Sequence, residues 1–157
     1  MNNVFSLPNK CTAEFLKEHW NDDPAKLLLQ SDRYSEVDMA WVAQQITGRK
    51  KAKEKIPAWY KNESLLYPPI ISMEQCSSES AAKYKAEICS GNSLLDLTGG
   101  FGVDTAFMSS NFTNTTYIER NAELAESAAY NFKQLGISDI AVMQADSTDI
   151  LYSPQEV

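Results

Sequence analysis

The sequence predicts an α/β fold: a helical N-terminal segment, then the first half of a doubly wound parallel sheet with about three strands. Two observations indicate it. Apolar residues recur at helical spacing in the first half, whereas short apolar runs alternate with helical patterns after Ser93. Prolines punctuate the connector 57–69, so we place a soft boundary there, between a helical domain over 1–70 and a ligand-binding domain over 71–157.

The composition limits the class of protein. Of the 157 residues, 43% are hydrophobic, which is enough for a packed core, and no apolar run approaches the roughly 20 residues that span a bilayer. The N-terminus lacks the basic start and apolar stretch of a signal peptide, so a cytoplasmic location is expected. The net charge of −7 gives no global field that would attract nucleic acid.

The first half contains two well-marked helices. Asp23 is suited to cap a helix that begins at Pro24. A longer helix is expected from Val37 to about Lys55, because four apolar residues recur there at helical spacing: Met39, Val42, Ala43 and Ile46. Gly48 is expected to end or bend this helix, and Pro57 stops whatever reaches it.

The second half alternates between helices and strands. Ser77 or Ser78 can cap a helix that Gly91 and Asn92 would stop. We then expect a buried strand at 94–97, followed by strands at 115–119 and 140–146 and helices at about 103–110 and 121–135. Gly136 is the expected C-cap of the last helix.

The ends of these strands carry the candidate ligand site. Gly99, Gly100 and Gly102 follow the first strand, where glycine permits a sharp turn and a close approach of ligand to backbone. Glu119 ends the second strand, and Asp146 follows the third. Ligands of doubly wound sheets bind at the carboxyl ends of strands, and an acid after the second strand can accept ribose hydroxyls.

Two ligands fit a nucleoside held in this way, a dinucleotide and S-adenosyl-L-methionine. The dinucleotide fingerprint GxGxxG lacks its third glycine here, and Asp104 at the helix start would repel a pyrophosphate. S-adenosylmethionine carries an ammonium and a sulfonium, which suit Asp96 and Asp104. The methyl donor is therefore favoured, and an NAD-dependent oxidoreductase is the enzyme alternative.

Several segments resemble a known family. Residues 94–104, "LLDLTGGFGVD", resemble the first motif of class I S-adenosylmethionine-dependent methyltransferases, whose fold is Rossmann-like. Residues 117–121 and 144–149 resemble their second and third motifs. The segment 72–86 and the helices before it resemble a bacterial group of methyltransferases with a THUMP-like domain.

The resemblance implies roles for the candidate residues. The three glycines would wrap the methionine part of the cofactor, and Asp96 would hold its amino group, through water. Glu119 would bind the ribose hydroxyls, while Asp146, with Ser147 beside it, would meet the adenine amino group. The entrance would be lined by Glu74, Gln75 and Ser77 or Ser78. The full cofactor-binding set comprises Gln75, Asp96, Thr98, Gly99, Gly100, Phe101, Gly102, Asp104, Glu119, Arg120, Asp146 and Ser147.

The resemblance stops short of a whole methyltransferase sheet. The fourth strand and the substrate-positioning motif after it have no counterpart, so the chain is interpreted as the N-terminal part of a longer enzyme, with unknown catalytic residues. An open edge on a buried parallel strand favours self-association. The non-enzyme alternative is a remnant that binds a nucleoside or a partner without catalysis.

RNA is the favoured substrate, by analogy. A basic run beside aromatic residues suits contact with an RNA backbone and stacking on bases: Arg49, Lys50, Lys51, Lys53 and Lys55, followed by Trp59. The alternative is a solvated helix face, since Glu54 is interleaved.

The cysteines and the histidine indicate no further chemistry. Cys11, Cys76 and Cys89 are far apart and form no CxxC pair, so reduced structural thiols are expected, with neither a disulfide framework nor a metal site. Cys76 as a nucleophile is the less favoured interpretation, because it precedes the sheet. His19 is expected to pack or cap.

Overall fold

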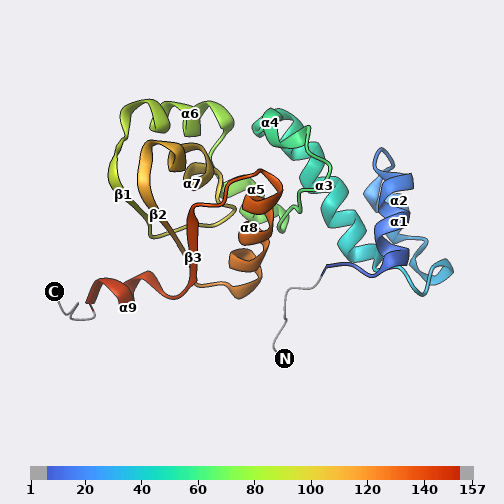
Figure 1. The fold of residues 1–157 in the computed structure, drawn as a ribbon. Helices are drawn as coiled ribbons and strands as arrows, with labels where there is room; N and C mark the ends of the chain where they lie inside the picture. The colour runs from blue at the N-terminus through green and yellow to red at the C-terminus, as the bar shows by residue number, and fades with distance from the viewer. Residues whose placement is uncertain (1–6, 153–157) are drawn as a thin grey trace.

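The computed structural model describes residues 7–152 and confirms the α/β fold class (Figure 1). Among these residues, helices precede a three-stranded parallel sheet of order β1-β2-β3. The helical part comprises α1 (Lys10–His19), α2 (Pro24–Leu28), the 3₁₀ turn Ser31–Arg33, α3 (Met39–Lys55), α4 (Pro57–Tyr60), α5 (Ile70–Gln75) and α6 (Glu79–Ile88). The sheet part comprises β1 (Gly91–Asp96), α7 (Val103–Met108), the 3₁₀ turn Ser109–Asn111, β2 (Phe112–Glu119), α8 (Ala122–Gln134), β3 (Ile140–Gln144) and α9 (Ser147–Tyr152).

The N-terminal helices form a small core of their own around the first half of α3. Asp23 caps α2 and Asp38 caps α3, each by accepting a hydrogen bond from a backbone N–H of its helix. The apolar face predicted for α3 is buried and packs on α1 and α2 through Phe15, Leu16, Leu27, Met39, Val42 and Ile46. Figure 1 shows α1 and α2 at the end of α3 that lies away from the sheet.

Gly48 does not end α3, which corrects that part of the prediction from sequence. The helix continues to Lys55, and a Cβ on Gly48 would lie 2.3 Å from Cβ of Tyr67. Glycine is therefore needed at this position because the connector crosses the helix at close range. Pro57 acts as expected, since α3 ends before it and α4 begins with it.

Two buried amide side chains fix the connector between the helical part and the sheet. Gln45 of α3 accepts from the backbone N of Tyr67 (2.7 Å) and donates to its carbonyl (3.0 Å). Asn131 of α8 does the same for Leu66, at 2.9 and 2.8 Å. The connector is thereby held between α3 and α8 by side chains that satisfy its backbone.

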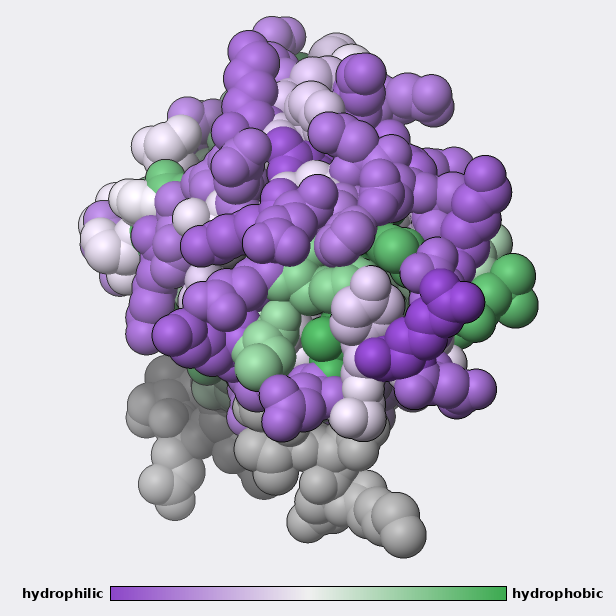
Figure 2. All heavy atoms as spheres, turned by 90° about the vertical axis from the view of Figure 1, so that its right-hand side faces the viewer, coloured by the Kyte–Doolittle hydropathy of each residue, from purple (hydrophilic) through white to green (hydrophobic). Residues whose placement is uncertain are grey.

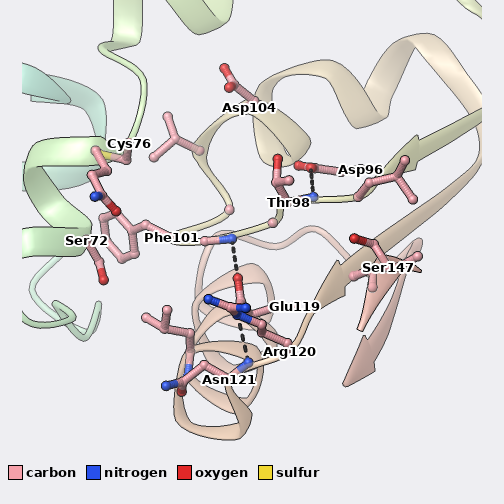
Figure 3. Close-up of a pocket in the computed structure, with 18 of the residues that line it drawn as sticks. Ser72, Cys76, Asp96, Thr98, Phe101, Asp104, Glu119, Arg120, Asn121 and Ser147 are labelled. Atoms are coloured by element: carbon pink, nitrogen blue, oxygen red, sulfur yellow. Dashed lines mark hydrogen bonds between the residues drawn. The ribbon is translucent and has the colours of Figure 1, made fainter. Parts of the chain in front are cut away.

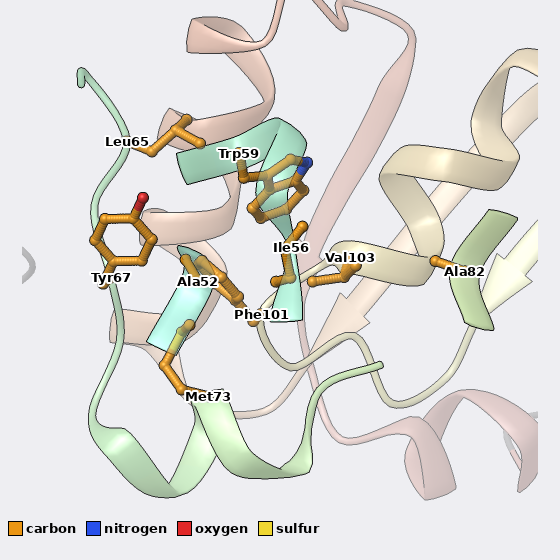
Figure 4. Packing of buried hydrophobic residues seen from close by; sticks show 9 residues of the cluster. All are labelled: Ala52, Ile56, Trp59, Leu65, Tyr67, Met73, Ala82, Phe101 and Val103. Carbon is orange, nitrogen blue, oxygen red and sulfur yellow. The ribbon is translucent and has the colours of Figure 1, made fainter. Parts of the chain in front are cut away.

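The largest core cluster crosses the predicted boundary near residue 70. It joins α3, α4 and the connector to α5, α6 and the glycine turn, through Ala52, Ile56, Trp59, Leu65, Tyr67, Met73, Ala82, Phe101 and Val103 (Figure 4). The ring of Phe101 meets that of Trp59 edge-on at 4.9 Å between centroids. Division into domains 1–70 and 71–157 stays a prediction, which independent folding of the two parts would test.

Two expectations around β1 are wrong. The helix capped by Ser78 ends at Ile88, and Gly91 and Asn92 open β1 instead of stopping the helix. Asn111 donates to the carbonyls of Ala86 and Cys89, so a side chain from elsewhere closes the helix end.

The strand β1 is also less buried than expected, because one face of the sheet is only partly covered. Tyr117 of β2 packs on Ala128 and Phe132 of α8. By register, Leu95 and Met143 share the opposite face, and they are 49% and 47% exposed. Within the described residues, β1 and β3 are the sheet edges.

The surface around the N-terminal helices is mostly polar. Figure 2 shows this face as largely hydrophilic, with apolar residues near its centre and at its right edge. Within 7–152, every helix is too short or too polar to cross a membrane.

Candidate functional site

The glycine turn after β1 is pinned to the end of β2 by three hydrogen bonds. The backbone N of Gly99 donates to the carbonyl of Ile118 (2.9 Å), and that of Gly100 donates to Oε2 of Glu119 (2.9 Å). The buried hydroxyl of Tyr117 donates to the carbonyl of Gly100 (2.6 Å). The peptide groups of the turn are therefore fixed before any ligand arrives.

At each of the three positions, a steric or conformational reason requires glycine. Gly100 and Gly102 have φ values of +53° and +82°, which side chains rarely adopt. A Cβ on Gly99 would lie 2.2 Å from the ring of Tyr117, and one on Gly102 would lie 2.7 Å from the ring of Phe132. The turn thus presents bare backbone on one side and packs tightly on the other.

The predicted acids lie at the three strand ends, and each is already held in place. Asp96 accepts from the backbone N of Thr98 (3.1 Å) and from the hydroxyl of Thr105. Glu119 accepts from Gly100 through one oxygen and from the backbone N of Asn121 (2.8 Å) through the other. Figure 3 shows the Glu119 carboxylate between these two backbone groups, at the centre of the site.

Asp146 after β3 is held by Thr148. The hydroxyl and the backbone N of Thr148 both donate to its Oδ1, at 2.7 and 2.9 Å. These hydrogen bonds, the hydroxyl first, hold the pKa of Asp146 below its ordinary value. The carboxylate is therefore ionised and able to accept further hydrogen bonds.

Asp104 has partners that the sequence did not reveal. Its Oδ2 accepts from Nζ of Lys85 (2.6 Å) and from the hydroxyl of Ser77 (2.8 Å), and Lys85 also donates to Ser77 (3.0 Å). Lys85 lies on α6, whose packing on α7 brings the two side chains together. No spacing in the sequence relates residues 85 and 104, so Lys85 was missed.

These residues surround one cavity of about 830 Å³ at the carboxyl ends of the strands. All twelve predicted cofactor-binding residues line it, Gln75, Arg120 and Ser147 included, together with Ser72, Cys76 and Asn121, which were not predicted (Figure 3). The structure therefore brings the whole predicted set together. Their contact with a cofactor stays a prediction.

Cys76 lies at the cavity wall as a protonated thiol. Its Sγ donates to the carbonyl of Met73 (3.2 Å), and burial raises its pKa above the ordinary value. A raised pKa keeps the thiolate fraction low, which agrees with the structural role favoured from sequence.

The basic run on α3 is largely engaged within the chain. Trp59 is 3% exposed, so it cannot stack on a base, and its expected role as an exposed aromatic is wrong. Arg49 lies over the rings of Trp20 (4.5 Å) and Tyr60 (5.0 Å) and pairs with Glu63. Lys55 donates to the carbonyls of Met73 and Glu74. The sequence pattern assigned Trp59 and Lys55 to an RNA-binding surface. In the structure Trp59 is buried in the core, and Lys55 caps the end of α5.

The fold is Rossmann-like, and its cavity lies at the carboxyl ends of the strands, where ligands of such folds bind. A sequence model of the family protein-L-isoaspartate(D-aspartate) O-methyltransferase (PCMT) matches residues 33–150, about three quarters of the 157 residues. The chain therefore belongs to the PCMT family of methyltransferases.

One solved structure supports the assignment to the methyltransferases. The chain is similar to a protein from Porphyromonas gingivalis W83 assigned as a methyltransferase, with 30% identity and a TM-score of 0.78. That match covers 94% of this chain and 38% of the other, so the chain spans well under half the length of that protein.

Two further comparisons add no support. An rRNA methylase from Streptococcus thermophilus has 18% identity and a TM-score of 0.39, over 47% of this chain and 46% of that one, which is too weak a likeness to argue from. A search among curated proteins found no match.

Proposed function

We propose that this chain binds S-adenosyl-L-methionine in the 830 Å³ cavity and forms the cofactor-binding part of a methyltransferase. The observation that carries the proposal is the bond from the Gly100 N–H to Glu119. In a dinucleotide site such N–H groups face the pyrophosphate. Here a carboxylate accepts from that N–H, and Asp104 lies in the first turn of the next helix, so the turn suits a ligand without phosphate.

The residues present fit this cofactor. Glu119 has lone pairs left for two ribose hydroxyls, because each of its oxygens accepts one bond from the backbone. Asp146, after the neighbouring strand β3, is an acceptor for the adenine amino group, and the bare turn after β1 lies alongside the remainder of the ligand. When bound, the cofactor supplies an electrophilic methyl group. The chain's own residues hold and orient it, which is the main demand of a displacement reaction.

We propose RNA as the class of methyl acceptor, and the proposal rests only on the positive charge of the lysines on α3. Lys53 is exposed on α3 and Lys51 is partly so. Arg49, Lys50 and Lys55 are hydrogen-bonded within the chain. The name of the matched family refers to a protein acceptor instead. The narrower THUMP-like group, a cytoplasmic location and a non-catalytic remnant also stay predictions.

RNA binding can be tested on α3 directly. Lys51→Glu/Lys53→Glu should weaken binding of a fluorescent single-stranded RNA at least tenfold at low salt and reduce its salt dependence. Lys10→Glu/Lys17→Glu, at two exposed positions of α1, makes the same change of charge and is the control. Equal RNA affinity in all three proteins, together with labelling of an isoaspartyl peptide by radioactive methyl donor, would contradict an RNA acceptor.

The sheet has an edge and a partly apolar face that could serve for self-association. Leu95 and Met143 leave one face partly apolar, and among the described strands β1 has an edge without a partner strand. We propose that the chain associates with itself through this region. Sedimentation should detect dimers at micromolar concentration, and Leu95→Lys should weaken them. A monomer at every concentration would be evidence against this contact.

The cofactor proposal is tested by removing the central acid. Glu119→Gln should weaken binding of S-adenosylhomocysteine about ten- to a hundredfold, because a charged acceptor of ligand hydroxyls is lost. Glu87→Gln removes the same charge from the exposed face of α6 and should leave affinity unchanged. Equal affinity in both variants would contradict the proposed site.

A further inference from the structure

One wall of the 830 Å³ cavity comes from outside the sheet. Ser72, Gln75 and Cys76, which belong to α5 and its C-cap, line the cavity although they precede β1. Figure 3 shows Ser72 and Cys76 on one side of the site and Ser147 of α9 on the other. The position of α5 therefore helps to set the shape of the site.

Packing alone holds α5 weakly. The helix has six residues, of which Met73 is the buried one. Ile70 and Ile71 at its start are 43% and 56% exposed. An isolated helix of this length is not stable in water, so α5 depends on contacts with the rest of the chain.

The segment after Met73 is bordered by open space on two sides. A second cavity, of about 430 Å³, lies between α3 and this segment and is lined by Lys51, Glu54, Lys55, Glu74 and Ser78. The residues between the last two, 75–77, line the larger cavity instead. Because the segment 74–78 separates two cavities, hydrogen bonds rather than close packing must fix its position.

Lys55 of α3 supplies two of these hydrogen bonds. A helix leaves its last four carbonyls without partners inside the helix. In α5 the carbonyl of Ser72 accepts from the backbone N of Cys76 (3.0 Å). The next two, of Met73 and Glu74, accept from Nζ of Lys55 at 2.9 and 2.6 Å. The ammonium also suits the negative end of the helix dipole.

The contact continues from Lys55 to the cavity wall. The carbonyl of Met73 accepts a second hydrogen bond, from Sγ of Cys76 (3.2 Å), and Cys76 lines the larger cavity. Lys55 itself lines the second cavity and not the larger one. Lys55 therefore reaches the ligand site through α5.

We infer that Lys55 is a positioning residue for the methyl donor. It caps α5 and so holds Ser72, Gln75 and Cys76 in place at the cavity before a ligand arrives. A wall that is ordered in advance costs less to order on binding, which raises affinity. This inference rests on the proposed function, and it gives Lys55 a role within the chain where the basic run in the sequence indicated contact with RNA.

Calorimetric titration of the full chain with S-adenosylhomocysteine tests the role. Lys55→Met keeps most of the apolar stem and removes the charged donor, so it should weaken binding about tenfold. Lys55→Arg keeps a charged donor and should restore affinity to within about threefold of the wild type. Lys26→Met makes the same change at an exposed position of α2, outside both cavities, and should leave affinity unchanged.

A stability control separates positioning from a general loss of stability. Val42→Ala opens a space in the small core of α1, α2 and α3, and it should destabilise the chain without disturbing α5. Under conditions in which each protein is folded, it should bind S-adenosylhomocysteine as the wild type does. In the free chain, Lys55→Met should accelerate hydrogen exchange of the amides of 72–76 about tenfold, and Val42→Ala should not.

The outcomes separate this inference from the proposed function. If the wild type binds and Lys55→Met binds equally well, the proposed function stands and the inference is wrong. The inference is also wrong if Val42→Ala weakens binding as much as Lys55→Met does, because affinity then follows stability alone. Weaker binding by Lys55→Met with unchanged exchange at 72–76 would show that Lys55 does not act through α5. If the folded wild type does not bind, the proposed function fails, and the positioning role fails with it.

Discussion

The carboxamide of Asn131 in α8 pairs with both backbone groups of Leu66, in the way that a neighbouring strand would. Asn131 is fully buried and 65 residues away in sequence. Together with the pairing of Gln45 and Tyr67, this bond joins the helical part to the helix that supports Glu119. The helical part is thus one of the supports of the cavity.

Asn131→Ala should destabilise the chain by about 2–4 kcal/mol, because it leaves the N–H and carbonyl of Leu66 without partners. Urea unfolding measures the change. Asn114→Ala, on the exposed side of β2, should cost less than about 1 kcal/mol. A loss below about 0.5 kcal/mol for Asn131→Ala would show that the connector is held by other contacts.

Gly48→Ala should destabilise the chain although alanine is the better helix former. The intrinsic gain is about 1 kcal/mol, but the new Cβ would lie 2.3 Å from Tyr67, and such overpacking costs about 1–3 kcal/mol. In a Tyr67→Gly background, which lacks the opposing Cβ, the same change should become a gain. A stabilising Gly48→Ala in the wild-type background would mean that the connector moves aside freely.

Tyr117→Phe should loosen the glycine turn. It removes the hydrogen bond to the Gly100 carbonyl and costs about 1–2 kcal/mol of stability, and ligand affinity should fall with it. Burial raises the pKa of Tyr117 well above its ordinary value, so the hydroxyl remains a donor through the working pH range. Tyr84→Phe, at an exposed position on α6, is the comparison, and equal affinity in both variants would contradict the role of the hydroxyl.

Glu79 gives a pH dependence with a definite sign. It accepts from Lys83 and from the backbone N of Ala58, and these bonds, that from Lys83 first, hold its pKa below 4.5. Because the folded-state pKa is depressed, the stabilisation is present above the unfolded value and is lost as the pH falls through the folded one. The stability difference between wild type and Glu79→Gln should therefore shrink below about pH 4. A constant difference from pH 7 to pH 3 would contradict this account.

Much of the site could be predicted from sequence because it lies at strand ends. The alternation of strands and helices places Gly100, Glu119 and Asp146 at one edge of a parallel sheet, whatever the details of packing. Lys85 could not be predicted, since its partner depends on how α6 packs on α7. Trp59 was misjudged for a similar reason: a basic neighbourhood in sequence says little about which side of a short helix is buried.

The exposure of β1 also could not be predicted from the sequence. The run Leu94–Leu95 predicts a strand buried on both faces, but among the described elements the supporting helix α8 covers only the face that carries Tyr117.

Calorimetric titration of the chain with S-adenosylhomocysteine, with NAD as the comparison, tests the central claim most directly. The account predicts that S-adenosylhomocysteine binds with one site per chain and that NAD does not bind. Binding of NAD instead, or of neither ligand to a folded sample, would contradict the assignment of this cavity to the methyl donor.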